Sequence, residues 1–92
     1  MIQSFRNRRT AALYEGERVI EFEPFRRQAE RRLQMLDDAV MLRDLAEIPG
    51  NRLEALSGNR KGQYSVRINR QWRICFIWYE DGAHEVEIVD YH

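Results

Sequence analysis

Residues 64–79 read Tyr64-Ser65-Val66-Arg67-Ile68-Asn69-Arg70-Gln71-Trp72-Arg73-Ile74-Cys75-Phe76-Ile77-Trp78-Tyr79, and this stretch decides the fold. Apolar and polar residues alternate along residues 63–68, which is typical of a strand with one buried face. Residues 72–79 are apolar at odd and even positions alike, as in a strand inside a sheet. The residues between them, Asn69–Gln71, are polar and predict a turn. The stretch is therefore expected to form an antiparallel hairpin.

The length of the turn determines which residues of the two strands face each other. A three-residue turn matches apolar residues on one face, pairing Tyr64 with Phe76 and Val66 with Ile74. The same register places Arg67 directly opposite Arg73. Two like charges in this relation destabilise a sheet, so the pair calls for an explanation beyond folding.

The residues before the hairpin predict mainly helices. Met1–Phe5 is a plausible short strand, and Asn7 is a suitable N-cap for a short helix ending at Tyr14. Pro24 suits the first position of the main helix. The helical spacing of the apolar residues is interrupted near residues 37–38, where this helix is expected to bend or end. A second helix is expected to end before Pro49–Gly50.

The residues after the helices predict further strands, near residues 52–56 and at residues 83–90, with a hairpin turn at Asp81–Gly82. The order predicts an α+β fold. In this fold an N-terminal strand and helices pack on a mostly antiparallel sheet, which ends in a meander of three to four strands. Ninety-two residues allow one domain, residues 1–92.

Composition excludes several classes of protein. No apolar run is long enough to span a membrane or to act as a signal peptide. The single cysteine, Cys75, excludes a disulfide framework and indicates a reducing, cytoplasmic setting. The net charge is zero, but residues 51–75 carry six basic residues against Glu54, whereas residues 76–92 carry five acidic residues and no Lys or Arg.

The second hairpin predicts a charged cluster at the end of the sequence. A turn at Asp81–Gly82 sets Arg73 opposite Asp90, with His92 one step further on the same face. The row is open to three interpretations. It is a surface salt bridge, a metal site completed by His84, or a site where Arg67 and Arg73 hold a phosphodiester while His92 moves a proton. No HxH or HExxH spacing supports the metal.

Several motifs resemble the HigB branch of the RelE toxin superfamily. They are the segments 53–68 (Leu-Glu-Ala-Leu-Ser-Gly-Asn-Arg-Lys-Gly-Gln-Tyr-Ser-Val-Arg-Ile) and 69–74 (Asn-Arg-Gln-Trp-Arg-Ile), the ending Asp90-Tyr91-His92 and the opening Met1-Ile2-Gln3-Ser4-Phe5-Arg6. The resemblance covers essentially the whole chain. It implies a RelE-like small sandwich and a toxin of a type II toxin–antitoxin system, which cleaves mRNA in the ribosomal A site without a metal or other cofactor.

The resemblance also implies residue roles. By position, Arg73, Asp90, Tyr91 and His92 match active-site residues of the family. His92 would transfer protons and Arg73 would clamp the phosphate. Asp90 would orient His92, and Tyr91 would place the mRNA. Other basic residues would contact RNA: Arg60, Lys61, Arg67 and Arg70.

The chain departs from the family at two positions. Several members have a His where this chain has Glu54 and a Lys where it has Ser57. Glu54 is expected to lie near Arg67 or Arg73 and to support them electrostatically. The departure leaves an alternative: a catalytically weak protein of this fold that occupies the ribosome or acts as a co-repressor bound to its antitoxin.

The resemblance implies particular partners as well. They are a cognate helix-turn-helix antitoxin (HigA-like), the 70S ribosome with its mRNA, and operator DNA only through the antitoxin, with no membrane.

Overall fold

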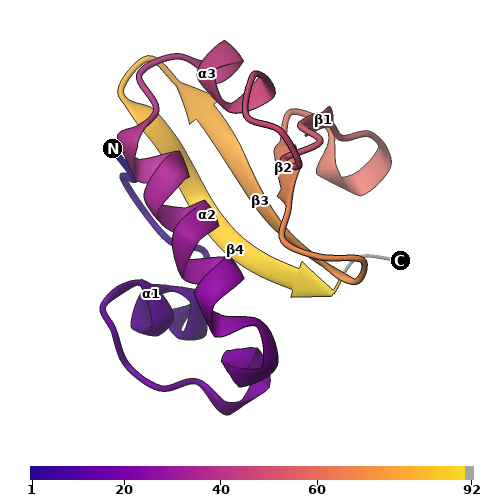
Figure 1. Ribbon diagram of the computed structural model, residues 1–92. Coiled ribbons are helices and arrows are strands. Elements are labelled where there is room, and N and C mark those ends of the chain that lie inside the picture. Colours follow the sequence, from indigo (N-terminus) through magenta and orange to yellow (C-terminus); the bar gives the residue numbers. More distant parts are fainter. Residues whose placement is uncertain (91–92) are drawn as a thin grey trace.

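The computed structural model describes residues 1–90 (Figure 1). Its elements are α1 (Arg8–Tyr14), η1 (Ile20–Phe25), α2 (Arg26–Asp38), α3 (Leu42–Ala46), β1 (Glu54–Ala55), η2 (Gly58–Arg60), β2 (Tyr64–Arg67), β3 (Trp72–Tyr79) and β4 (Gly82–Asp90). The predicted α+β class is confirmed. No helix among these residues has the length and apolar character needed to cross a bilayer.

The four strands form one antiparallel sheet in the order β1-β2-β3-β4. The predicted register of the first hairpin is confirmed, because Tyr64 pairs with Phe76 and Arg67 pairs with Arg73. The long strand β3 lies between β2 and β4. It is buried from Arg73 to Phe76, which accounts for its apolar residues at both parities.

The predicted register of the second hairpin is wrong, by two residues next to the turn, where Ile77 faces His84 and not Val86, and by one residue beyond Cys75. Tyr79 pairs with Gly82, so the turn residues are Glu80 and Asp81 rather than Asp81 and Gly82. The ladder then shifts between Cys75 and Ile77. As a result Arg73 faces Val89 and Asp90 faces Trp72.

A β-bulge in β4 causes the shift. Glu85 and Val86 together oppose Phe76, and Glu85 has a left-handed φ of 53°. The N-terminal segment holds this conformation. Ser4 Oγ accepts from the Glu85 amide at 2.9 Å, and Ser4 O accepts from the Val86 amide at 3.1 Å.

The N-terminal segment lies along the outer edge of β4. The bridges Ile2 to Ala83 and Phe5 to Val86 are parallel. The predicted strand at residues 1–5 is therefore not formed, and the segment is attached to β4 by two isolated bridges only. Asn7 follows and caps α1 as predicted, its side chain accepting from the Thr10 amide at 3.0 Å.

Helix α2 lies across one face of the sheet (Figure 1) and buries Ala29, Leu33 and Leu36. The core between them contains inward-facing residues of three strands, namely Val66, Ile74, Phe76, Val86 and Ile88. The prediction that Pro24 begins the main helix is wrong. Pro24 lies inside η1, and α2 begins at Arg26.

Candidate functional site

The face of the sheet opposite α2 carries polar and charged side chains. The strand pairings show which residues point to this face, away from the core: Glu54, Ser65, Arg67, Arg73, Cys75, Glu87 and Val89. We call this set the polar face. Three of its polar side chains are buried, namely Ser65, Arg73 and Glu87. Burial of charged groups costs free energy unless they have partners, so their contacts define the site.

Arg73 is held by neutral acceptors. Its Nε donates to Ser65 Oγ at 2.7 Å, and its Nη2 donates to the carbonyl oxygens of Arg52 at 2.6 Å and Ser65 at 3.4 Å. The residue is 8% exposed. These contacts place one guanidinium in a defined position and leave its positive charge at the polar face.

Glu54 is the carboxylate next to this guanidinium. Strand β1 pairs Glu54 with Ser65, and Glu54 Oε1 lies 3.5 Å from Arg73 Nη1. The prediction that Glu54 lies near Arg67 or Arg73 is therefore confirmed for Arg73. The Glu54 side chain is 52% exposed, so solvent screens the pair and its contribution to stability is small.

A second charged contact crosses the polar face. Arg60 in η2 reaches Glu87 on β4, with Nη1 at 2.8 Å from Oε1. Glu87 Oε2 also accepts a hydrogen bond from Asn7 Nδ2 at 3.4 Å, and Glu87 Oε1 lies 3.8 Å from Arg6 Nε. One buried carboxylate thus connects β4, η2 and the segment before α1. We call the Arg60–Glu87 pair the cross-sheet pair.

Cys75 lies next to the cross-sheet pair. It faces Ser65 on β2 and Glu87 on β4 and is completely buried. Burial is the largest cause that raises the pKa of its thiol, and Glu87 adds to it, while the charges of Arg60 and Arg73 oppose it. The thiol is therefore neutral near pH 7 and is a poor nucleophile.

Four cations of residues 51–75 surround this region without carboxylate partners among residues 1–90, namely Arg52, Lys61, Arg67 and Arg70. Arg67 Nε donates to the Asn69 carbonyl at 3.0 Å, which turns its guanidinium along the β2–β3 hairpin. Positive charge consequently lies at both ends of β2, from Lys61 before the strand and from Arg67 and Arg70 at the hairpin.

Asp90 is placed differently from the prediction. It faces Trp72, and its Oδ2 accepts from Gln71 Nε2 at 2.9 Å. The expected row with Arg73 directly opposite Asp90 is wrong, because the turn lies at Glu80–Asp81 and the bulge in β4 then shifts the register again. The predicted site residues Tyr91 and His92 lie outside the residues that the structure describes.

Sequence reasoning missed Ser65, Glu87 and the Arg52 carbonyl. The register of the first hairpin places Ser65 on the same face as Arg67 and Arg73, which was a usable signal. Glu87 had no such signal, because its position on the polar face depends on the bulge. Arg52 has a left-handed φ of 45°, which its neighbours in the sequence do not indicate.

The contacts allow this face to bind an anion. Arg73 is fixed by neutral acceptors, pairs with the half-exposed Glu54 and faces a second cation, Arg67, and this arrangement suits phosphate or another oxyanion. Within residues 1–90, no three side chains of His, Cys, Asp or Glu are grouped as metal ligands.

Known proteins resemble this chain at two levels. A family model described as the RelE-like toxin of the type II toxin–antitoxin system HigB matches residues 3–92. Toxin HigB-1 of Vibrio cholerae serotype O1 is 47% identical over 53 residues, which cover 58% of this chain and 56%, little more than half, of that toxin.

Solved structures share the fold. A YoeB–YefM complex from Staphylococcus aureus matches with a TM-score of 0.63 and 18% identity, over 100% of this chain and 98% of the other. A heterotetrameric YoeB–YefM toxin–antitoxin complex from the same organism matches with the same values. At this identity the likeness shows the fold alone.

Proposed function

The chain belongs to the HigB-like family of RelE-like toxins of type II toxin–antitoxin systems, and we propose that it is a ribosome-dependent endoribonuclease. It cleaves mRNA in the ribosomal A site and thereby inhibits translation. By its resemblance to the family, it works in the cytoplasm without a metal or other cofactor. RNA supplies its own nucleophile, the 2′-hydroxyl, so no Ser or Cys nucleophile is required.

The pairing of Arg67 with Arg73 is the observation that carries this proposal. Two facing cations repel each other in the free protein, and an arriving phosphodiester relieves that repulsion. Arg73 is already positioned by Ser65 and Arg52, so little reorganisation is needed when charge develops on phosphorus.

We assign the remaining roles from the family resemblance alone, since Asp90 faces Trp72 and not Arg73. His92 transfers the proton, Asp90 orients it and Tyr91 places the base. The RNA backbone is contacted by the basic residues around the polar face, namely Arg60, Lys61, Arg67 and Arg70. Glu54 supports Arg73 and is not the principal base, since its carboxylate is already paired with the guanidinium.

The partners follow from the family. A cognate helix-turn-helix antitoxin of the HigA type neutralises the toxin and binds operator DNA, so the toxin reaches DNA only through it. The 70S ribosome supplies the orientation of the mRNA that a small site lacks. Because the chain has zero net charge, its affinity for naked RNA is modest and falls as salt rises.

A second candidate function is favoured by the contacts of Arg73. Its guanidinium is buried and bonded to protein acceptors, as a purely structural arginine would be. The chain would then be a catalytically weak binding module, which inhibits translation by occupying the ribosome or acts as a co-repressor with its antitoxin.

The test uses purified protein with ribosomes stalled on a defined mRNA. Primer extension then maps new 5′ ends. Cleavage within the A-site codon at substoichiometric protein is expected for the nuclease, and intact mRNA with inhibition only at one protein per ribosome is expected for the binding module. Efficient cleavage of the same mRNA without ribosomes at physiological salt would contradict the ribosome requirement.

A further inference from the structure

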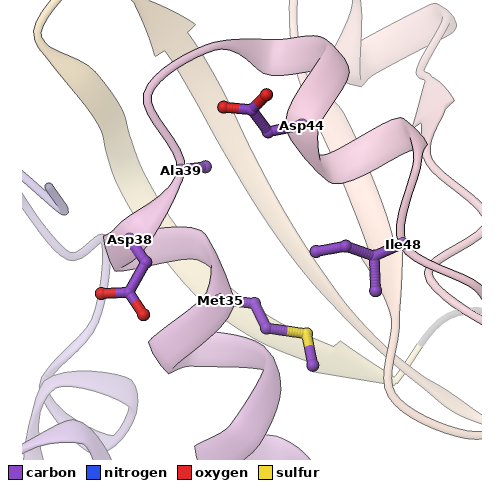
Figure 2. A pocket seen from close by; sticks show the side chains of 5 residues that line it. All are labelled: Met35, Asp38, Ala39, Asp44 and Ile48. Carbon is purple, nitrogen blue, oxygen red and sulfur yellow. The ribbon is translucent and has the colours of Figure 1, made fainter.

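A hollow lies between the end of α2 and α3, away from the polar face. Its volume is about 290 Å³, and it is lined by Met35, Asp38, Ala39, Asp44 and Ile48. Figure 2 shows the side chains of Met35 and Ile48 extending toward each other, with Asp38 on α2 and Asp44 on α3. The lining therefore combines apolar side chains with two carboxylates.

A second hollow adjoins the first. It has a volume of about 230 Å³ and shares Asp38 and Ala39 with its neighbour. The rest of its lining comes from Met1, Val40 and the β3–β4 turn, residues 80–82. The chain approaches itself closely here, since a Cβ on Gly82 would collide with the Met1 carbonyl.

Large apolar side chains are exposed around the two hollows. Val40 is 78% exposed, and Met1 and Met41 are exposed as well. Three exposed apolar residues beside two connected hollows form a patch of the kind that marks a protein contact. We call the two hollows with Met1, Val40 and Met41 the acidic patch.

The charge of the acidic patch determines what it can bind. Four carboxylates line the hollows, those of Asp38, Asp44, Glu80 and Asp81, against one cation, the α-amino group of Met1. Asp44 already accepts from the Val40 and Met41 amides, and Asp81 contacts His84. Such a surface repels phosphate and attracts cationic groups. It is therefore not a second RNA-binding face.

The acidic patch is also remote from the polar face. Its second hollow lies at the β3–β4 turn, at one end of β3, whereas Arg73 lies near the other end. At about 3.3 Å per residue, Tyr79 lies roughly 20 Å from Arg73 along β3. A ligand on the acidic patch does not touch the cations of the polar face.

We propose that the acidic patch is the docking site for a short cationic segment of the cognate antitoxin. An aliphatic side chain of that segment enters the hollow between α2 and α3, and its Lys or Arg residues face Asp38 and Glu80. The two hollows, of about 290 and 230 Å³, are large enough to take single side chains of such a segment. The inference rests on the proposed antitoxin partner and adds where and how it binds.

The test measures the Kd between this chain and the product of the adjoining antitoxin reading frame by calorimetry. Val40→Asp places a charge on the apolar part of the patch. The matched control is Ile20→Asp, because Ile20 is 79% exposed and lies in η1, away from the patch. We expect Val40→Asp to weaken binding by about tenfold or more, as for a central interface residue, and Ile20→Asp to leave it within about twofold.

A second variant tests the charge. Asp38→Lys with Glu80→Lys should weaken binding by a similar factor and reduce its dependence on salt, whereas Glu17→Lys should do neither. Both Asp38 and Glu80 are exposed, so the variant should fold, which the thermal unfolding midpoint checks. An unchanged Kd for both Val40→Asp and the double variant would overturn the proposal.

Two further readouts separate the possible failures. Translation inhibition by the Val40→Asp protein alone should equal that of the wild type, because Val40 lies outside the polar face. If the wild type binds the antitoxin through the patch but cleaves no mRNA, the proposed function fails and the docking site stands. If Val40→Asp abolishes self-association seen by light scattering but not antitoxin binding, the patch binds a second copy and the proposal is wrong.

Discussion

Arg60 and Glu87 form a 2.8 Å ion pair across the polar face, although Arg60 lies in a loop beside β2 and Glu87 lies on β4. The Glu87 carboxylate is nearly buried and also accepts a hydrogen bond from the Asn7 side chain. This contact connects the basic loop to the far side of the sheet, so it sets the position of a proposed RNA-binding residue.

The cross-sheet pair should contribute to stability. Glu87→Ala is expected to lower the free energy of unfolding by about 1–3 kcal/mol, because it removes the nearly buried carboxylate that accepts from Arg60 and Asn7. Urea denaturation of the two single variants and the double variant Glu87→Ala with Arg60→Ala measures the coupling. Additive effects, within about 0.3 kcal/mol, would show that the pair does not act as a unit.

Arg67 should be needed for activity but not for stability. Arg67→Gln removes the repulsion with Arg73, so the free energy of unfolding should stay unchanged or rise by a few tenths of a kcal/mol. Cleavage on stalled ribosomes should fall by about tenfold, equivalent to about 1.4 kcal/mol in the barrier. Arg27→Gln, on the exposed side of α2, is the matched control. A clear loss of stability with unchanged cleavage would assign Arg67 a structural role.

His92 is predicted to be the principal proton-transfer residue. His92→Gln should reduce cleavage by about 10²–10⁴-fold, the usual contribution of a general acid or base. The pH dependence of the wild-type rate should show one ionisation near neutral pH. Full toxicity of His92→Gln on overexpression would refute the assignment.

Glu54 should support Arg73 rather than act as a principal catalyst. Its carboxylate lies 3.5 Å from the guanidinium and is half exposed, so Glu54→Gln should cost about tenfold in rate. Glu54→His should be tolerated. Single-turnover cleavage measures both, and a loss for Glu54→Gln as large as that for His92→Gln would make Glu54 a principal catalyst.

Cys75 and Tyr14 should make the protein less stable in alkali. Burial is the largest cause that raises both the pKa of the Cys75 thiol above its ordinary 9.0 and the pKa of the Tyr14 phenol above its ordinary 10.0. The unfolded chain therefore loses these protons first as the pH rises, and stability falls above those ordinary values. Urea denaturation from pH 8 to 11 checks this. Cys75→Ala should remove the part of the decrease in unfolding free energy that begins at the lower pH, and Tyr14→Phe the part that begins at the higher pH. If neither variant changes how the free energy of unfolding depends on pH, the assignment is wrong.

The sequence by itself determined the elements whose signals are local. A three-residue turn and alternating apolar residues specified the β2–β3 register, because a slip of one residue would move Val66 and Ile74 out of the core. The same register revealed that Arg67 faces Arg73. The motifs at residues 53–74 pointed to the family, and Asn7 marked the start of α1.

Only the tertiary structure decided where β4 places its side chains. The bulge is held by hydrogen bonds that the Glu85 and Val86 amides donate to Ser4, about 80 positions earlier in the chain. Because strand side chains alternate with a period of two, that single extra residue moved Asp90 away from Arg73 and turned Glu87 toward Arg60. Contacts between distant segments decide such a shift, and no pattern within residues 82–90 contains them.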